Sequence, residues 1–179
     1  NQRRGDISGM IGTNRWRLEV GGPDRRSGPA CAGLRGVNLA TIIDPHPADA
    51  TAIISRGRAT NYGTLRDQVA ALRGAFIGMG LQPGDRLAII AGNNRYFVVS
   101  YLAALGAGLV AVPLNPTNPP VAMAHELRES GAVAIVASPT ARKALGAIDW
   151  DKVPGVAHFV GAGFEPGPLG VQFDDLLSH

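Results

Sequence analysis

The chain has 179 residues, of which 45% are hydrophobic and 17% are charged. This length is enough for one globular core, and the composition excludes an intrinsically disordered or a fibrous protein. Aromatic residues are few and glycine is abundant, with 24 residues, so helices can pack closely against a sheet.

The net charge of +3 is concentrated at the amino-terminal end. Residues 1–36 contain seven arginines and three acidic residues, whereas the other 143 residues carry ten basic and eleven acidic side chains. The globular part therefore lacks a basic footprint for phosphates, and no nucleic-acid partner is expected. We expect residues 1–36 to be a poorly ordered, Gly/Arg-rich extension with one short alternating segment from Arg15 to Val20.

Cysteine and histidine usage gives no sign of a metal site or a disulfide. Cys31 is the single cysteine, and the four histidines lie far apart in the sequence. No apolar run approaches the ~20 residues that span a bilayer, and the first residues lack the apolar core of a secretion signal. These features predict a cytoplasmic protein without a transmembrane segment.

Regular structure is predicted to begin near Val37. Segments 52–54 and 58–60 flank Gly57 and indicate a β-hairpin. A helix over 64–79 follows, because its apolar residues recur at helical spacing and form one stripe: Leu65, Val69, Leu72, Phe76 and Met79.

Short apolar strands and helices then alternate. Strands are predicted at 86–91, 109–112 (closed by Pro113), 133–136 and 156–160, and helices at 95–105, at 119–130, from Ser138–Pro139 onward and at 173–177. This alternation predicts an α/β fold: a hairpin, then strands and helices that form a mostly parallel sheet.

Five segments between residues 47 and 116 occur in the order known from one enzyme family. They are Pro47 to Ala52; Thr60-Asn61-Tyr62-Gly63-Thr64-Leu65; Gly80-Leu81-Gln82-Pro83-Gly84-Asp85-Arg86-Leu87-Ala88; Asn94 with Tyr101 to Ala104, Gly106 and Ala107; and Ala111-Val112-Pro113-Leu114-Asn115-Pro116. Each segment alone is a weak signal, but their common order and spacing are strong. Together they resemble the N-terminal region of adenylate-forming enzymes, most closely the fatty-acid–CoA ligases.

The resemblance implies that residues 37–179 are a partial N-terminal domain of an AMP-forming fatty-acid–CoA ligase. Asn115, where peptide-synthetase adenylation domains usually carry Asp, favours the acyl-CoA synthetase branch. The full-length enzyme would use ATP, magnesium and coenzyme A, take a carboxylic acid substrate such as a fatty acid, and have the remainder of the same polypeptide as partner.

The signature positions are expected to be structural, with no catalytic, cofactor-binding or metal-binding residue among them. They are Thr60, Tyr62, Leu65, Gly84, Asp85, Arg86, Asn94, Gly106, Pro113 and Asn115. Turns, helix starts and strand ends need residues of these types at these places.

Nothing in the chain matches the Ser/Thr/Gly-rich, lysine-bearing loop with which the family holds phosphates. Lys143 follows Arg142 on a predicted helix, and Lys152 lies beside Asp149 and Asp151. Gly161-Ala162-Gly163 is predicted to be a loop, Asp174-Asp175 a solvated helix start, and His125 with Glu126 and Glu129 a polar helix face. The chain alone is therefore expected to be inactive.

Two other functions fit the same sequence. One is a non-catalytic interaction module that kept this half of the fold, and the other is an adenylation domain that delivers its acyl group to a carrier protein.

Overall fold

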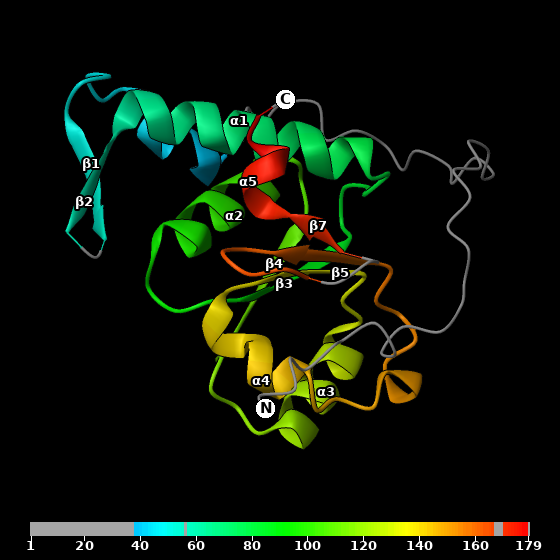
Figure 1. The fold of residues 1–179 in the computed structure, drawn as a ribbon. Helices are drawn as coiled ribbons and strands as arrows, with labels where there is room; N and C mark the ends of the chain where they lie inside the picture. The colour runs from blue at the N-terminus through cyan, green and yellow to red at the C-terminus, as the bar shows by residue number, and fades with distance from the viewer. Residues whose placement is uncertain (1–37, 56, 167–169, 179) are drawn as a thin grey trace, which may run out of the picture.

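The computed structural model describes residues 38–55, 57–166 and 170–178. Helices cover both faces of a central sheet, and a separate β-hairpin stands beside the long first helix (Figure 1). The predicted extension over residues 1–36, with its Arg15–Val20 segment, lies outside the described residues.

The described chain begins with a 3₁₀ turn, η1 (Leu39–Ile43), and the predicted hairpin. Strands β1 (Thr51–Ser55) and β2 (Arg58–Asn61) pair antiparallel, with Gly57 at φ 77° in the turn between them. This positive φ is a conformation that glycine adopts without steric cost. Within the described part of the chain, the hairpin is a two-stranded sheet separate from the central sheet.

Helix α1 (Tyr62–Gly78) begins at Asn61, whose side-chain oxygen accepts a hydrogen bond from the Thr64 amide at 2.8 Å. Such a cap satisfies one of the amide groups that the first turn of a helix leaves unpaired. Leu65, Val69, Leu72 and Phe76 are buried, as the predicted stripe requires, whereas Met79 lies just after the helix and is only partly buried.

Among the described residues, the central sheet has five strands, all parallel, in the order β4-β3-β5-β6-β7. They are β3 (Arg86–Ile90), β4 (Val110–Leu114), β5 (Ala134–Ala137), β6 (His158–Gly161) and β7 (Val171–Gln172). The predicted parallel α/β fold is confirmed, and β7 is an edge strand that the sequence did not indicate.

Two layers of helices enclose this sheet. Helices α1, α2 (Arg95–Gly106) and α5 (Phe173–Leu176) lie on one side, and α3 (Pro120–Ser130) and α4 (Arg142–Leu145) on the other (Figure 1). Two further 3₁₀ turns, η2 (Pro139–Ala141) and η3 (Trp150–Lys152), belong to the connections around α4.

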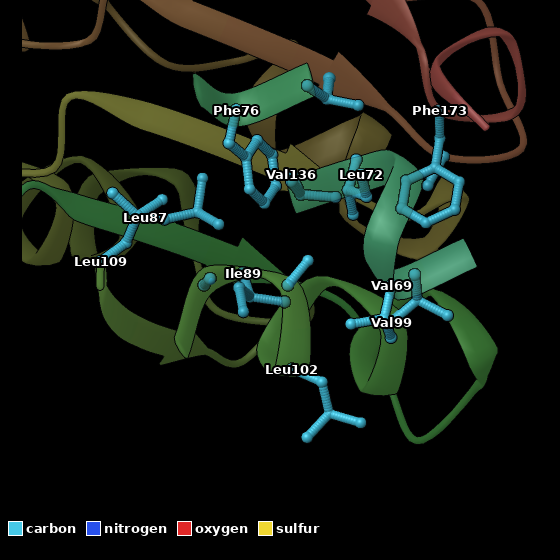
Figure 2. Close-up of a cluster of buried hydrophobic side chains, with 14 of the residues drawn as sticks. Val69, Leu72, Phe76, Leu87, Ile89, Val99, Leu102, Leu109, Val136 and Phe173 are labelled. Carbon is cyan, nitrogen blue, oxygen red and sulfur yellow. The ribbon is translucent and has the colours of Figure 1, made fainter. Parts of the chain in front are cut away.

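Successive side chains of each buried strand enter two separate hydrophobic clusters. Leu87 and Ile89 of β3 join the cluster under α1 and α2, while Ala88 and Ile90 join the cluster under α3 and α4. Figure 2 shows side chains of the first cluster, among them Phe76 of α1 and Val136 of β5. The continuous apolar runs in the sequence are thus explained by burial on both faces of the sheet.

The prediction that Pro113 closes a strand is wrong. Strand β4 runs through Leu114, and Pro113 lies opposite Ile89 of β3. Because β4 is an edge strand, only one of its sides forms a ladder, and a proline is tolerated where its missing N–H would face away from the neighbour.

The predicted helix after Ser138–Pro139 is also different in the structure. A 3₁₀ turn over Pro139–Ala141 comes first, followed by the four-residue helix α4. The Ser138 side chain makes no capping bond, because its hydroxyl is shared between the Ile90 carbonyl at 3.4 Å and the Thr140 hydroxyl at 2.8 Å.

Candidate functional site

The sheet order places a topological switch point between β3 and β5. Strand β3 lies between β4 and β5. The connection from β3 to β4 runs through α2 on one face of the sheet, whereas the connection from β5 to β6 runs through α4 on the other face. In open parallel sheets, ligands bind in the crevice at the carboxyl ends of the strands at such a point. In this sheet that point lies just after Ile90 of β3 and Ala137 of β5.

A cavity of about 500 Å³ lies at this place. Five chain segments line it: the hairpin, α1, the start of α2, the turn after β5 and the loop after β6. Its described lining residues are Ser55, Arg58, Ala59, Thr60, Asn61, Thr64, Gln68, Asn94, Arg95, Tyr96, Ser138, Pro139, Thr140 and Gly163. Its volume is in the range of small-molecule sites.

Asn94 brings the amino-terminal end of α2 to the cavity. Its backbone is extended, and its side-chain oxygen accepts a hydrogen bond from the Phe97 amide at 3.2 Å. The other amides of the first helical turn have no partner within the helix, so the end of α2 carries a partial positive charge.

Arg95 adds a full positive charge beside this helix end. Its Nη2 lies 2.6 Å from Oδ1 of Asp174, and its guanidinium stands 4.7 Å from the centroid of the Tyr96 ring. Burial disfavours the charged guanidinium, but the hydrogen bonds to Asp174 and Tyr96 outweigh it and the pKa of Arg95 is raised.

Ser138 anchors the opposite wall, directly after β5. It is fully buried, and its amide donates to the Ile90 carbonyl at 3.0 Å, which ties the turn to the end of β3. Its hydroxyl contacts that of Thr140, so two hydroxyl groups lie side by side at the carboxyl end of the sheet.

Gln68 of α1, one of the lining residues, has one unsatisfied polar atom. Its side-chain oxygen is buried and has no hydrogen-bond partner among the described residues. Buried polar atoms without a partner are uncommon and cost free energy in the folded state.

Only two of the ten signature positions, Thr60 and Asn94, line this cavity. Tyr62 begins α1, where its ring stacks on His46 with a centroid separation of 4.2 Å, and Leu65 is buried in the core.

The Gly84-Asp85-Arg86 segment lies at the other end of β3. Gly84 has φ 91° and its amide donates to the Gly108 carbonyl at 2.8 Å, and Asp85 accepts a hydrogen bond from the Gln82 amide at 2.8 Å. The Nε of Arg86 donates to the Ser130 carbonyl at 3.2 Å, at the carboxyl end of α3.

The last three positions, Gly106, Pro113 and Asn115, are not among the lining residues of the cavity either. Gly106 ends α2 where a Cβ would lie 3.2 Å from Cδ of Arg73, and Pro113 is in the edge strand β4. Asn115 accepts hydrogen bonds from the amide and the hydroxyl of Thr117 at 3.0 and 2.8 Å.

No sequence pattern predicted a site role for five of the lining residues: Arg58, Gln68, Arg95, Ser138 and Thr140. Asn94 and Ser138 could have been identified from the sequence, because each closely follows a short apolar strand. Parallel strands end at the same edge of a sheet, where ligands bind. Asp174 and Asp175 are exposed in the first turn of α5, as predicted, and Asp174 in addition pairs with Arg95.

The two lysines of the chain, Lys143 and Lys152, are not among the described lining residues of the cavity. Lys152 pairs with Asp149 at 3.0 Å in an exposed turn, and Lys143 is exposed on α4, so neither lysine reaches the cavity. Within the described ranges no three His, Cys, Asp or Glu side chains are grouped as metal ligands. No helix in the same ranges is long and apolar enough to cross a bilayer.

The fold is that of known CoA ligases. A structure of an anthranilate CoA ligase in complex with anthranoyl-AMP superposes with a TM-score of 0.74 at 19% identity, covering 79% of this chain and 28% of that one. A putative long-chain-fatty-acid CoA ligase from Rhodopseudomonas palustris gives 0.72 at 22% identity, covering 80% and 37%.

The family follows from the sequence comparisons. Residues 40–162 match the model of the AMP-binding enzyme family, and the chain belongs to this family. It is 36% identical over 91 residues to a long-chain-fatty-acid–CoA ligase of Yersinia pestis, and 31% identical over 136 residues to a feruloyl-CoA synthase of Amycolatopsis sp. These alignments cover 50% and 75% of this chain, but only 16% and 27% of the relatives.

Proposed function

We propose that this chain supplies the N-terminal part of the large domain of an AMP-forming acyl-CoA ligase. Residues 37–179 would be that part, and residues 1–36 an extension to it. The observation that carries the proposal is the family match over residues 40–162, on a parallel sheet that CoA ligases share.

The proposed reaction of the whole protein is the ATP-dependent activation of a carboxylic acid to its adenylate, followed by thioester formation with coenzyme A. A fatty acid or a related carboxylate is the proposed substrate. The relatives support this breadth, since one is named for long-chain fatty acids and another for ferulate.

In this proposal the described residues act as a scaffold and the remainder of the polypeptide is their partner. ATP, magnesium and coenzyme A would be held mainly by residues outside this chain, because the lysines described here lie away from the cavity. The chain by itself is therefore proposed to be inactive.

The test is carboxylate-dependent exchange of radiolabelled pyrophosphate into ATP. The 179-residue chain should show only background exchange, because the loop and the metal ligands that stabilise phosphate charge commonly contribute ~10²-fold or more each. A polypeptide that continues through the family's phosphate loop and C-terminal domain should show exchange with a fatty or aromatic acid.

Three results would decide between the alternatives. Exchange by the 179-residue chain itself would refute the proposal that this chain is inactive without the remainder of the polypeptide. If the longer polypeptide shows no exchange with any acid, a non-catalytic module is favoured. Exchange without thioester formation on coenzyme A, but with transfer to a carrier protein, would favour the adenylation domain.

A further inference from the structure

The β-hairpin exposes a large apolar side chain next to the cavity. Ile54 of β1 is 74% exposed. In the ladder it lies opposite Ala59 of β2, and residues opposite each other in an antiparallel pair have their side chains on the same face. Ala59 lines the cavity, so Ile54 flanks the cavity on the side of the hairpin. Ile54 and Ala59 with the adjoining cavity make up a surface, here named the hairpin face.

The hairpin is supported on its other face. Ile53 packs against the first hydrophobic cluster, and successive side chains of a strand point to opposite faces. The two strands form a sheet of their own beside α1, apart from the central sheet (Figure 1). A two-stranded hairpin is only marginally stable in water unless it packs against further structure. The exposed hairpin face is therefore a place where added structure would stabilise the fold.

The lining of the cavity sets the chemistry of a partner. Arg58 is exposed on β2 at the hairpin face, and none of the described lining residues is an Asp or a Glu. Five lining residues carry aliphatic hydroxyl groups that can bond to a peptide backbone: Ser55, Thr60, Thr64, Ser138 and Thr140. A peptide segment with an apolar side chain for Ile54 and a carboxylate for Arg58 matches this surface.

The last described helix is attached to the walls of the same cavity. Asp174 of α5 pairs with Arg95 at 2.6 Å, and the ring of Phe173 packs on that of Tyr96 with centroids 5.1 Å apart. Both Arg95 and Tyr96 line the cavity. Five positions separate Asp174 from position 179, and they span at most roughly 18 Å when fully extended. A polypeptide that continues from there starts close to the cavity.

We propose that the hairpin face is an intramolecular docking surface for a segment of the polypeptide that follows position 179, with an apolar side chain on Ile54 and a carboxylate on Arg58. The proposal rests on the proposed function, in which this chain is one part of a longer ligase. The alignments with the two relatives cover only 16% and 27% of their lengths, so most of such a protein lies outside this chain. Because the segment is tethered, a surface of modest size is enough to hold it.

The experiment compares hydrogen exchange of the backbone amides in the 179-residue chain and in the longer polypeptide, without ATP, coenzyme A or a carboxylic acid. Amides of residues 51–61 should exchange at least about tenfold more slowly in the longer polypeptide, because docking suppresses local opening of the hairpin. This slowing should be the same at low and high protein concentration. Amides of α3, on the other side of the sheet, are the internal reference.

Two substitutions place the contact on the hairpin face. Ile54→Lys should leave the Tm of the 179-residue chain nearly unchanged, because the side chain is exposed there, and should remove most of the protection in the longer polypeptide, because it buries a charge. Arg58→Glu should also reduce the protection, since it repels a carboxylate. Val121→Lys is the matched control, because Val121 is 82% exposed on α3, and it should change neither chain.

Equal exchange of residues 51–61 in the two polypeptides would overturn the proposal. Protection that grows with protein concentration would replace it with a contact between two copies, and protection that needs a substrate would replace it with a ligand site. Protection that neither Ile54→Lys nor Arg58→Glu reduces would overturn it as well. Pyrophosphate exchange enters none of these readouts. A longer polypeptide that fails to exchange pyrophosphate can still protect the hairpin, so the two failures are distinguishable.

Discussion

Arg95 and Asp174 are 79 positions apart in the chain and meet at 2.6 Å, where the first turn of α2 faces the first turn of α5. The neighbouring residues meet as well, since the rings of Tyr96 and Phe173 pack edge to face with centroids 5.1 Å apart. One ionic and one aromatic contact thus attach the last described helix to the carboxyl end of the sheet.

We expect the aromatic contact to contribute most of the stability of this attachment. Phe173 is fully buried, so Phe173→Ala should lower the free energy of unfolding by about 3–5 kcal/mol. Asp174→Asn should cost no more than about 1 kcal/mol, because the pair is partly exposed to water. Urea unfolding of both variants checks this, with Asp175→Asn as the control for loss of one exposed charge. A larger loss from Asp174→Asn than from Phe173→Ala would contradict it.

The apolar stripe of α1 makes a second prediction. Phe76 is fully buried between α1 and the sheet (Figure 2), and its neighbour Ile77 is 59% exposed. Phe76→Ala should therefore cost about 3–5 kcal/mol in the free energy of unfolding, and Ile77→Ala less than about 1 kcal/mol. A cost below about 1 kcal/mol for Phe76→Ala would show that the stripe does not face a core.

Periodicity explains why α1 could be predicted closely from the sequence. Its buried residues recur at helical spacing, and the Asn61 cap lies at its start. Strand β3 was predictable for a related reason, since four successive apolar residues on a parallel strand are buried on both faces.

Other features depend on contacts that no local pattern records. Strand β7 has two residues, too few for an alternation to show. Pro113 continues β4 only because that strand is at the edge of the sheet. The cavity is assembled from segments between Ser55 and Gly163, so its lining could not be deduced before the strand order was known.

The structure also predicts a dependence of stability on pH through His158. Burial lowers the pKa of this half-buried histidine below its ordinary value of 6.5, and the nearby charge of Asp85 opposes the effect only in part. At pH values below the ordinary pKa of histidine, His158 takes up a proton more readily in the unfolded chain than in the folded chain. The stability that is present above this pKa is therefore lost as the pH falls.

This predicts that the free energy of unfolding decreases between about pH 7.5 and pH 5.5, and that His158→Gln makes the decrease smaller. The measurement is urea unfolding at several pH values. His125→Gln is the matched control, because His125 is an exposed histidine on α3, and it should leave more of the decrease in place. An identical pH dependence for His158→Gln and the unmodified chain would assign the decrease to other groups.

Replacing Gly131 and Gly74 by alanine should change the free energy of unfolding in opposite directions. Gly131 follows α3 with φ 63°, and a Cβ there would lie 2.7 Å from Nη2 of Arg86, whose Nε donates to the Ser130 carbonyl. Gly74 lies within α1, exposed, with no atom within 4 Å of an added Cβ.

Gly131→Ala should therefore cost at least about 1–2 kcal/mol in the free energy of unfolding, because alanine disfavours the left-handed conformation and displaces the Arg86 guanidinium from the end of α3. Gly74→Ala should instead add up to about 1 kcal/mol, because alanine favours a helix and the site is open. Thermal and urea unfolding of the two variants and the double variant measure this, and the effects should add, since the sites are on different helices. Combining Gly131→Ala with Arg86→Lys separates the two causes, because lysine removes the guanidinium that the added Cβ would meet. The cost of the left-handed backbone should remain in this variant. Full recovery of stability would mean that the collision with Arg86 alone was responsible.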